Sequence, residues 1–133
     1  MIPDRMHKLF LISASILGAL GVALGAFGAH GLKKIVSQES VTVFQTGVQY
    51  QMYHVFALLI LGVLAERFAS SFIHYSGFFF LGGIVLFSGS LYLAVSLEAM
   101  NRVVPTMVRL ITPVGGLFFI VGWILLLIGI IRK

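Results

Sequence analysis

The residues of this sequence best suited to chemistry are polar side chains that lie within or beside long apolar runs. Histidine can transfer a proton near neutral pH or ligate a metal, and glutamine both donates and accepts hydrogen bonds. The candidate polar cluster comprises His30, Gln45, Gln49, Gln51, His54 and Arg109. Such a cluster is suited to hydrogen bonding between helices, to proton relay or to holding a ligand.

The depth of these groups follows from the apolar run 55–65, which begins directly after His54. This run has 11 residues and spans only about 16 Å as a helix, whereas the hydrocarbon layer is about 30 Å thick. A helix that crosses the layer must therefore extend back to about Thr46. Gln49, Gln51 and His54 then lie inside the membrane, where polar side chains must face protein or a wet cavity.

Each candidate also has a purely structural interpretation. His54 could hydrogen-bond a glutamine or tyrosine of another helix instead of binding a ligand or relaying protons. His30 stands at the end of an apolar run, where an imidazole suits the negative end of a helix dipole. Arg109 requires a carboxylate, a carbonyl or a lipid phosphate as partner. Glu98 and Arg102 are four residues apart, so we expect a surface ion pair.

Several classes of chemistry are excluded. The chain has no cysteine, which removes disulfides, thiol redox chemistry and thiolate metal sites. Asp4 is the only aspartate, and no H-E-x-x-H or G-x-S-x-G motif occurs. A haem between His30 and His54 is not expected because the two residues lie at unequal depths. We therefore expect no enzyme activity, no metal site and no cofactor.

The composition is that of a membrane protein. Of the 133 residues, 59% are hydrophobic and only 10% are charged, and the mean hydropathy is +1.08. A soluble domain has about 25% charged residues. The formal net charge is +5, but the Lys and Arg residues stand at the ends of apolar runs, as in membrane proteins. We expect contact with membrane lipids and no binding of nucleic acid.

Four apolar segments predict an all-α fold, an integral membrane four-helix antiparallel bundle in a single domain, 1–133. The expected spans are 9–30, 46–65, 72–97 and 113–131, with an interfacial segment at 32–45. The first uncharged run, Leu9–Ala29, has 21 residues, which is too long for a signal peptide and long enough to remain as an anchor.

Local signals predict where two of these helices begin. Ser40 is the expected N-cap of the second helix. Thr112 and Pro113 resemble an N-cap followed by a first-turn proline. The alternative is a longer last helix that starts near Pro105 and is kinked at Pro113.

Regularly spaced glycines predict where the helices pack. Steps of three and four in the first helix, and of seven in the third and fourth, place small residues on one face, where a neighbouring backbone can approach. The expected packing positions are Gly18, Gly21, Gly25, Gly28, Gly82, Gly89, Gly115 and Gly122. We expect the first helix to be the one on which the others pack, and Trp123, in mid-span, to lie between helices.

Four separated stretches resemble a known family. They are Leu24–Lys34, Phe44–His54, Ser88–Tyr92 and Ile111–Trp123. In this order they resemble the domain-of-unknown-function family 423, small four-span membrane proteins of bacteria whose eukaryotic relative is called transmembrane protein 256. The resemblance implies a four-helix protein of the bacterial inner membrane or of an organelle. It implies no activity and supplies no catalytic residues.

The function expected from these observations is that of a small, non-enzymatic multi-pass membrane protein that binds a lipid or a partner. The partner would be another membrane protein or a second copy of the chain. The alternative is a small proton-coupled transporter or channel in which His54 carries the proton. Four spans put both termini on one side, which carries five cations against four on the other. The positive-inside rule then favours cytoplasmic termini in a bacterial inner (plasma) membrane.

Overall fold

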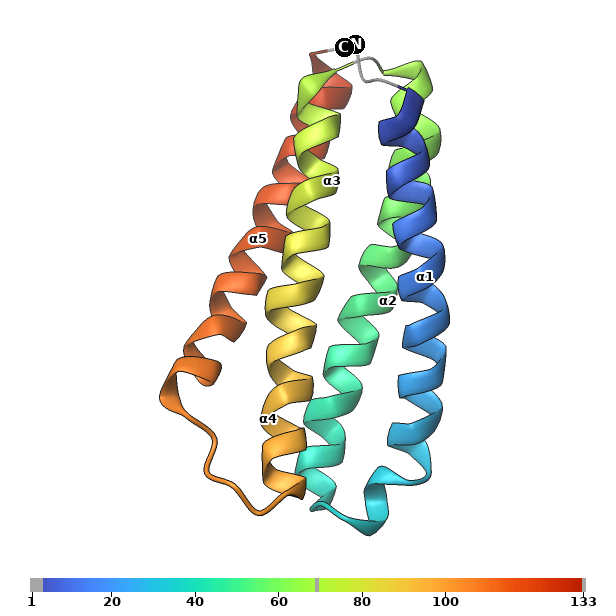
Figure 1. The fold of residues 1–133 in the computed structure, drawn as a ribbon. Coiled ribbons are helices and arrows are strands. Elements are labelled where there is room, and N and C mark those ends of the chain that lie inside the picture. The colour runs from blue at the N-terminus through green and yellow to red at the C-terminus, as the bar shows by residue number, and fades with distance from the viewer. Residues whose placement is uncertain (1–3, 69, 133) are drawn as a thin grey trace.

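The protein folds into long helices joined by short connections (Figure 1). The computed structural model describes residues 4–68 and 70–132. In chain order the elements are α1 (Asp4–Ala29), the short 3₁₀ helix η1 (Leu32–Lys34), α2 (Gln38–Arg67), α3 (Ser71–Gly83), the π-helical segment η2 (Ile84–Ser88), α4 (Gly89–Ala99) and α5 (Thr106–Ile131). Because α3, η2 and α4 follow one another directly, they form one continuous rod.

Four helical stretches, His7–Lys34, Gln38–Arg67, Ser71–Ala99 and Thr106–Ile131, are long and apolar enough to cross a membrane. They have 26 to 30 residues, which corresponds to about 39–45 Å at 1.5 Å per residue. That length exceeds the hydrocarbon layer of about 30 Å, so both ends of each helix reach the headgroup region. The predicted all-α membrane fold is confirmed.

The helices are arranged as two tight pairs joined through α2. α1 packs along α2 and α3 packs along α5, while α2 also contacts α3, η2 and α4 (Figure 1). The expectation that the other helices pack on the first helix is therefore wrong, because α2 holds the central position. The reason is that α2 buries residues on two faces, towards α1 and towards the rod.

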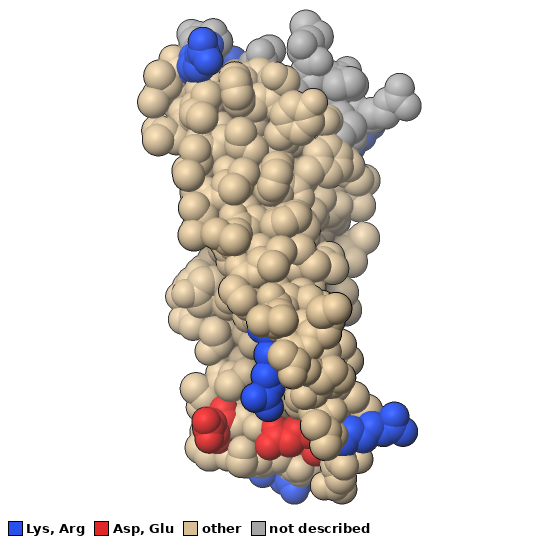
Figure 2. Space-filling model, turned by 90° about the vertical axis from the view of Figure 1, so that its left-hand side faces the viewer, with Lys and Arg blue, Asp and Glu red and all other residues tan. Residues whose placement is uncertain are grey.

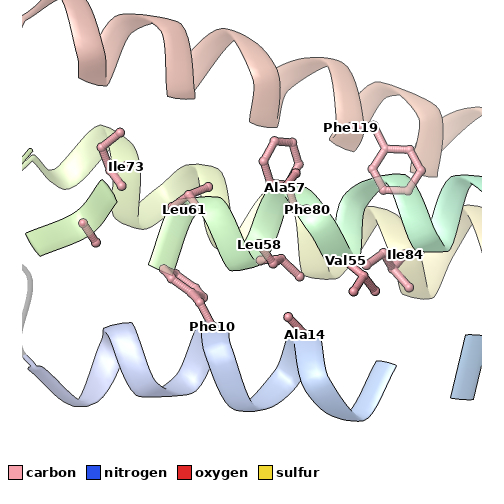
Figure 3. Close-up of a cluster of buried hydrophobic side chains, with 11 residues drawn as sticks. Phe10, Ala14, Val55, Ala57, Leu58, Leu61, Ile73, Phe80, Ile84 and Phe119 are labelled. Carbon is pink, nitrogen blue, oxygen red and sulfur yellow. The ribbon is translucent and has the colours of Figure 1, made fainter. Parts of the chain in front are cut away.

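The main hydrophobic core lies in the half of the molecule where α1 begins and α2 ends. Its buried residues are Phe10, Ala14, Val55, Ala57, Leu58, Leu61, Ala65, Ile73, Phe80, Ile84 and Phe119 (Figure 3). The fully buried Phe10 ring occupies the space that a Cβ on Gly77 would need. The absence of a side chain at Gly77 thus lets α1 contact α3 at this end.

Helix α2 begins earlier than the sequence predicted. Its N-cap is Ser37, whose Oγ accepts a hydrogen bond from the Ser40 backbone N–H at 3.2 Å. Ser40 is therefore inside the helix, and residues 38–45 of the expected interfacial segment form its first turns. Glu39 lies in this first turn, where a carboxylate is favoured by the helix dipole.

Helix α5 also begins earlier than its preferred prediction. It starts at Thr106 and contains Pro113, so the predicted N-cap at Thr112 is wrong and the longer helix of the alternative is present. The Thr112 hydroxyl instead hydrogen-bonds the Ser90 hydroxyl of α4 at 2.6 Å. Proline is tolerated inside a membrane helix because neighbouring helices help to satisfy the local polar groups.

The π-helical segment η2 changes which residues face the core. A π-turn inserts one extra residue and shifts the register of everything that follows. Ser88 and Val95 are buried, whereas a Cβ on Gly89 would meet nothing within 4 Å. Gly89 therefore does not take the packing position that the seven-residue spacing from Gly82 predicted.

The other predicted packing glycines face neighbouring helices. A Cβ would lie within 3.0 Å of another helix at Gly21, Gly28, Gly82, Gly115 and Gly122, and at 3.4 Å at Gly18 and Gly25. The closest approach is at Gly115, where a Cβ would fall on the backbone of Phe87. The α5 backbone thus touches the backbone of η2.

Candidate functional site

The predicted polar cluster does not form one site. Two of its members are buried, Gln51 and His54, while four are exposed, His30, Gln45, Gln49 and Arg109. The His30 ring nitrogen Nδ1 hydrogen-bonds the Ala26 carbonyl of its own helix at 3.0 Å, which fits the expected role at a helix end. The buried and exposed members therefore need separate accounts.

Gln51 connects three helices. Its side chain is only 2% exposed. The Nε2 group donates to the Leu17 carbonyl of α1 at 2.7 Å, and Oε1 accepts from the Tyr92 hydroxyl of α4 at 2.6 Å. Both the amide NH₂ group and the amide oxygen are hydrogen-bonded within the protein, so the role of Gln51 is structural.

Two buried serines, which the sequence did not single out, form similar links. Ser76 of α3 donates to the Gly122 carbonyl of α5 at 2.7 Å. Ser88 donates to the Gly47 carbonyl of α2 at 2.6 Å. In each pair a small hydroxyl meets a glycine on an apolar helix, which is the sequence signal that could have identified them.

His54 is held with both ring nitrogens occupied. Nδ1 lies 2.7 Å from the Tyr50 carbonyl, and Nε2 lies 3.0 Å from the Trp123 Nε1. A carbonyl can only accept and an indole N–H can only donate, so the ring is the neutral tautomer with its proton on Nδ1. No nitrogen remains free for a metal, a haem or a proton relay. The transporter alternative is therefore not favoured.

His54 forms part of the wall of a groove between α2 and α5. Its ring stacks on Phe119, with centroids 3.6 Å apart and planes 8° from parallel. The cavity has a volume of about 620 Å³. It is lined by Tyr50, His54, Phe87, Pro113, Gly116, Leu117, Phe119, Ile120 and Trp123. We call it the α2–α5 groove.

The rim of the α2–α5 groove is open to the surroundings. Trp123 was expected to lie between helices, but its side chain is 47% exposed at the rim. Leu117 and Ile120 are also exposed. The groove exists because α5 packs on α3 and η2 and not along α2.

A second cavity lies at the end of the molecule where α2 and α5 begin and α4 ends. It has a volume of about 450 Å³ and is lined by Ser37, Glu39, Ser40, Val43, Glu98, Arg102, Val103, Val104 and Arg109. We call it the end pocket. Acidic and basic side chains gather at this end, below a wide surface without charged residues (Figure 2).

The ion pair between Glu98 and Arg102 that the sequence predicted is not present. The Glu98 carboxylate accepts a hydrogen bond from the Ser40 hydroxyl, and no ion pair with Arg102 forms in the described residues. α4 ends at Ala99, and the chain leaves it through Asn101, whose φ is 57°. Arg102 is therefore off the helix, so the four-residue spacing does not bring it over Glu98.

Four apolar helices of membrane length, with charges at both ends and a lateral groove between two of them, define a small polytopic membrane protein. The chain belongs to the family described as "Protein of unknown function (DUF423)", whose model matches residues 24–116. The predicted family is thus confirmed.

Relatives match over nearly the whole chain. The UPF0382 membrane protein SAB0533 of Staphylococcus aureus is 42% identical over 122 residues, 92% of this chain and 94% of the relative. The UPF0382 inner membrane protein YgdD of Escherichia coli is 42% identical over 125 residues, 94% of this chain and 91% of the relative. The UPF0382 membrane protein YwdK of Bacillus subtilis is 37% identical over 126 residues, 94% and 98% respectively. No solved structure matches significantly.

Proposed function

We propose that this protein is a non-enzymatic lipid-binding protein, and that a lipid acyl chain occupies the α2–α5 groove. The observation that carries the proposal is the apolar cavity of about 620 Å³, a size typical of ligand pockets. His54 is 16 residues from the start of α2 and 13 from its end, about 24 and 20 Å away. The groove therefore lies near the middle of the membrane.

The chemistry of the groove favours a hydrocarbon chain over a polar ligand. Its walls are aromatic and aliphatic except for His54, and both nitrogens of His54 already have partners. An apolar cavity offers water no hydrogen bonds. A lipid chain next to the open rim can fill the space without desolvating any polar group.

The membrane and the orientation are part of the same proposal. One relative is named an inner membrane protein. The end of the bundle that carries both termini has five cations, and the opposite end has four. We therefore assign the chain to the bacterial inner membrane with cytoplasmic termini. The chain has no cysteine, so in Lys33→Cys the single thiol lies on the side opposite the termini. We expect it to react with an impermeant maleimide added outside intact inner-membrane vesicles of native orientation, whose outer face is the periplasmic one. No reaction until the vesicles are opened would show the reverse orientation.

Filling the groove tests the lipid proposal. At Gly116 a Cβ would meet only Phe87 Cδ2, at 4.0 Å, so Gly116→Leu can place its side chain in the groove without a backbone clash. In native mass spectrometry we expect the purified variant to carry about one tenth, or less, of the phospholipid that the wild type retains.

The matched control is Gly89→Leu. It makes the same chemical change at a site outside the groove where a Cβ meets nothing within 4 Å, and it should retain lipid as the wild type does. Equal lipid retention by both variants and the wild type would show that the groove does not hold a lipid.

A further inference from the structure

We propose that the end pocket binds the headgroup of the lipid whose chain lies in the α2–α5 groove, and that this headgroup carries both a phosphate and a primary ammonium, as phosphoethanolamine does. This inference rests on the proposed function. It adds the chemical class of the lipid, which the groove alone does not determine.

The two cavities share the same helix faces. Among the residues of α5 that line them are Arg109 in the end pocket and Pro113, Gly116, Ile120 and Trp123 in the groove. Their steps of four and three residues place them on one side of the helix. On α2, Val43 lines the end pocket, and Tyr50 and His54 line the groove, at steps of seven and four. The cavities therefore follow one another between α2 and α5.

The distance along this path suits one leaflet. Arg109 and Trp123 are 14 residues apart on α5, about 21 Å along the axis. One leaflet contributes about 15 Å of hydrocarbon. A phospholipid with its headgroup in the end pocket can therefore place its acyl chain in the groove, and the end of that chain passes the bilayer midplane by only a few ångströms.

The arginines of the end pocket are free to bind a phosphate. Arg102 and Arg109 are exposed, and neither guanidinium has a hydrogen bond or an ion pair with any residue that the structure describes. Guanidinium groups bind phosphate oxygens through paired hydrogen bonds. α5 also begins here without a side-chain cap, which adds unpaired N–H groups and the positive end of its dipole.

The carboxylates of the end pocket favour a headgroup that carries a primary ammonium. Glu39 is exposed and, in the described part of the chain, its carboxylate has no partner, while Glu98 is oriented by the Ser40 hydroxyl. A primary ammonium can donate three hydrogen bonds to such groups. A quaternary ammonium donates none and is bound by aromatic rings, which do not line this pocket. An anionic phosphoglycerol would leave both carboxylates without a cation.

The test compares three phospholipids with identical chains and different headgroups. Delipidated protein in mild detergent is titrated with the phosphoethanolamine, phosphocholine or phosphoglycerol lipid, and the bound fraction is measured by native mass spectrometry. We expect the phosphoethanolamine lipid to bind about tenfold more tightly than either of the others.

Glu39→Gln is expected to abolish the preference for phosphoethanolamine over phosphocholine and to leave the affinity for phosphocholine unchanged. The control is Glu66→Gln, which removes a carboxylate at the opposite end of α2 and should keep the preference. Arg109→Gln should weaken the binding of all three lipids, and so should Arg102→Gln. Arg102 lies outside the helices, so its substitution cannot disturb their packing. Arg132→Gln, at the opposite end of α5, should weaken none.

The possible failures are distinguishable. Equal affinity for the three lipids, or tighter binding of phosphoglycerol, would overturn the headgroup assignment and leave the lipid in the groove in place. Binding of none of the lipids by the wild type would overturn the proposed function itself, and with it this inference.

Discussion

Two glutamines on α2 show how burial separates similar residues. Gln49 and Gln51 are two positions apart and were placed together as candidates. Gln49 is exposed, whereas Gln51 is buried and hydrogen-bonded to both α1 and α4. A buried amide in an apolar bundle stabilises the fold only when both of its ends have partners. The role of Gln51 is thus to fix the positions of three helices.

Gln51→Leu should lower the stability of the protein. The substitution removes two hydrogen bonds between helices and leaves the Tyr92 hydroxyl without its acceptor. With about 0.6 kcal/mol for each bond and some penalty for the unpaired hydroxyl, we expect a loss of about 1–2 kcal/mol in the free energy of unfolding. The measurement is an SDS titration of the protein in mixed micelles.

Gln49→Leu is the matched control, because it makes the same change two residues away at a side chain without a partner in the described structure. Its unfolding free energy should stay within about 0.5 kcal/mol of the wild type. If the two variants were equally stable, the hydrogen bonds of Gln51 would not hold the helices together.

Helix α5 and the segment η2 depend on a close backbone contact. A Cβ on Gly115 would overlap the Phe87 backbone, and a backbone cannot move aside as a flexible side chain can. We expect Gly115→Ala to cost about 1–3 kcal/mol of unfolding free energy. Gly89→Ala should be neutral or stabilising by up to about 1 kcal/mol, because the added methyl meets open space and alanine favours a helix. The same SDS titration measures both, and a Gly115→Ala variant as stable as Gly89→Ala would contradict this packing.

The helices themselves were predictable, because an uncharged run of about 20 residues has few alternatives to a helix in lipid. Their exact starts were less so. Ser37 and Ser40 are both good N-caps in sequence, and the geometry of the turn before α2 decides between them. The π-turn in η2 has no local signal in its apolar residues, yet its extra residue moves burial from Gly89 to Ser88.

The candidate site was predictable only in part. The depth of His54 followed from the short apolar run after it, and its partner Trp123 was recognised as a mid-span residue. The groove was not predictable, because it results from the way α5 lies on η2 and α3 instead of on α2. The stripe of Pro113, Gly116 and Ile120 on α5 becomes meaningful only once that placement is known.

The molecule as a whole is a rod whose charged residues lie towards its ends (Figure 2). The distribution of polar groups along it resembles that of a lipid: a charged region at the end pocket and an apolar groove further along the same two helices. This correspondence links the proposed headgroup site to the lipid chain proposed for the groove. Trp123 is the only tryptophan of the chain and stands at the rim of the groove, so its fluorescence reports on the occupant.

A lipid in the α2–α5 groove is detected most directly by the quenching of Trp123 fluorescence by a phospholipid with brominated chains, titrated into delipidated protein in mild detergent. We expect quenching that saturates at about one lipid per chain in the wild type and in Gly89→Leu, and that is lost in Gly116→Leu. Quenching that rises in proportion to the brominated lipid without saturation, and equally in all three proteins, would contradict a lipid bound in the α2–α5 groove.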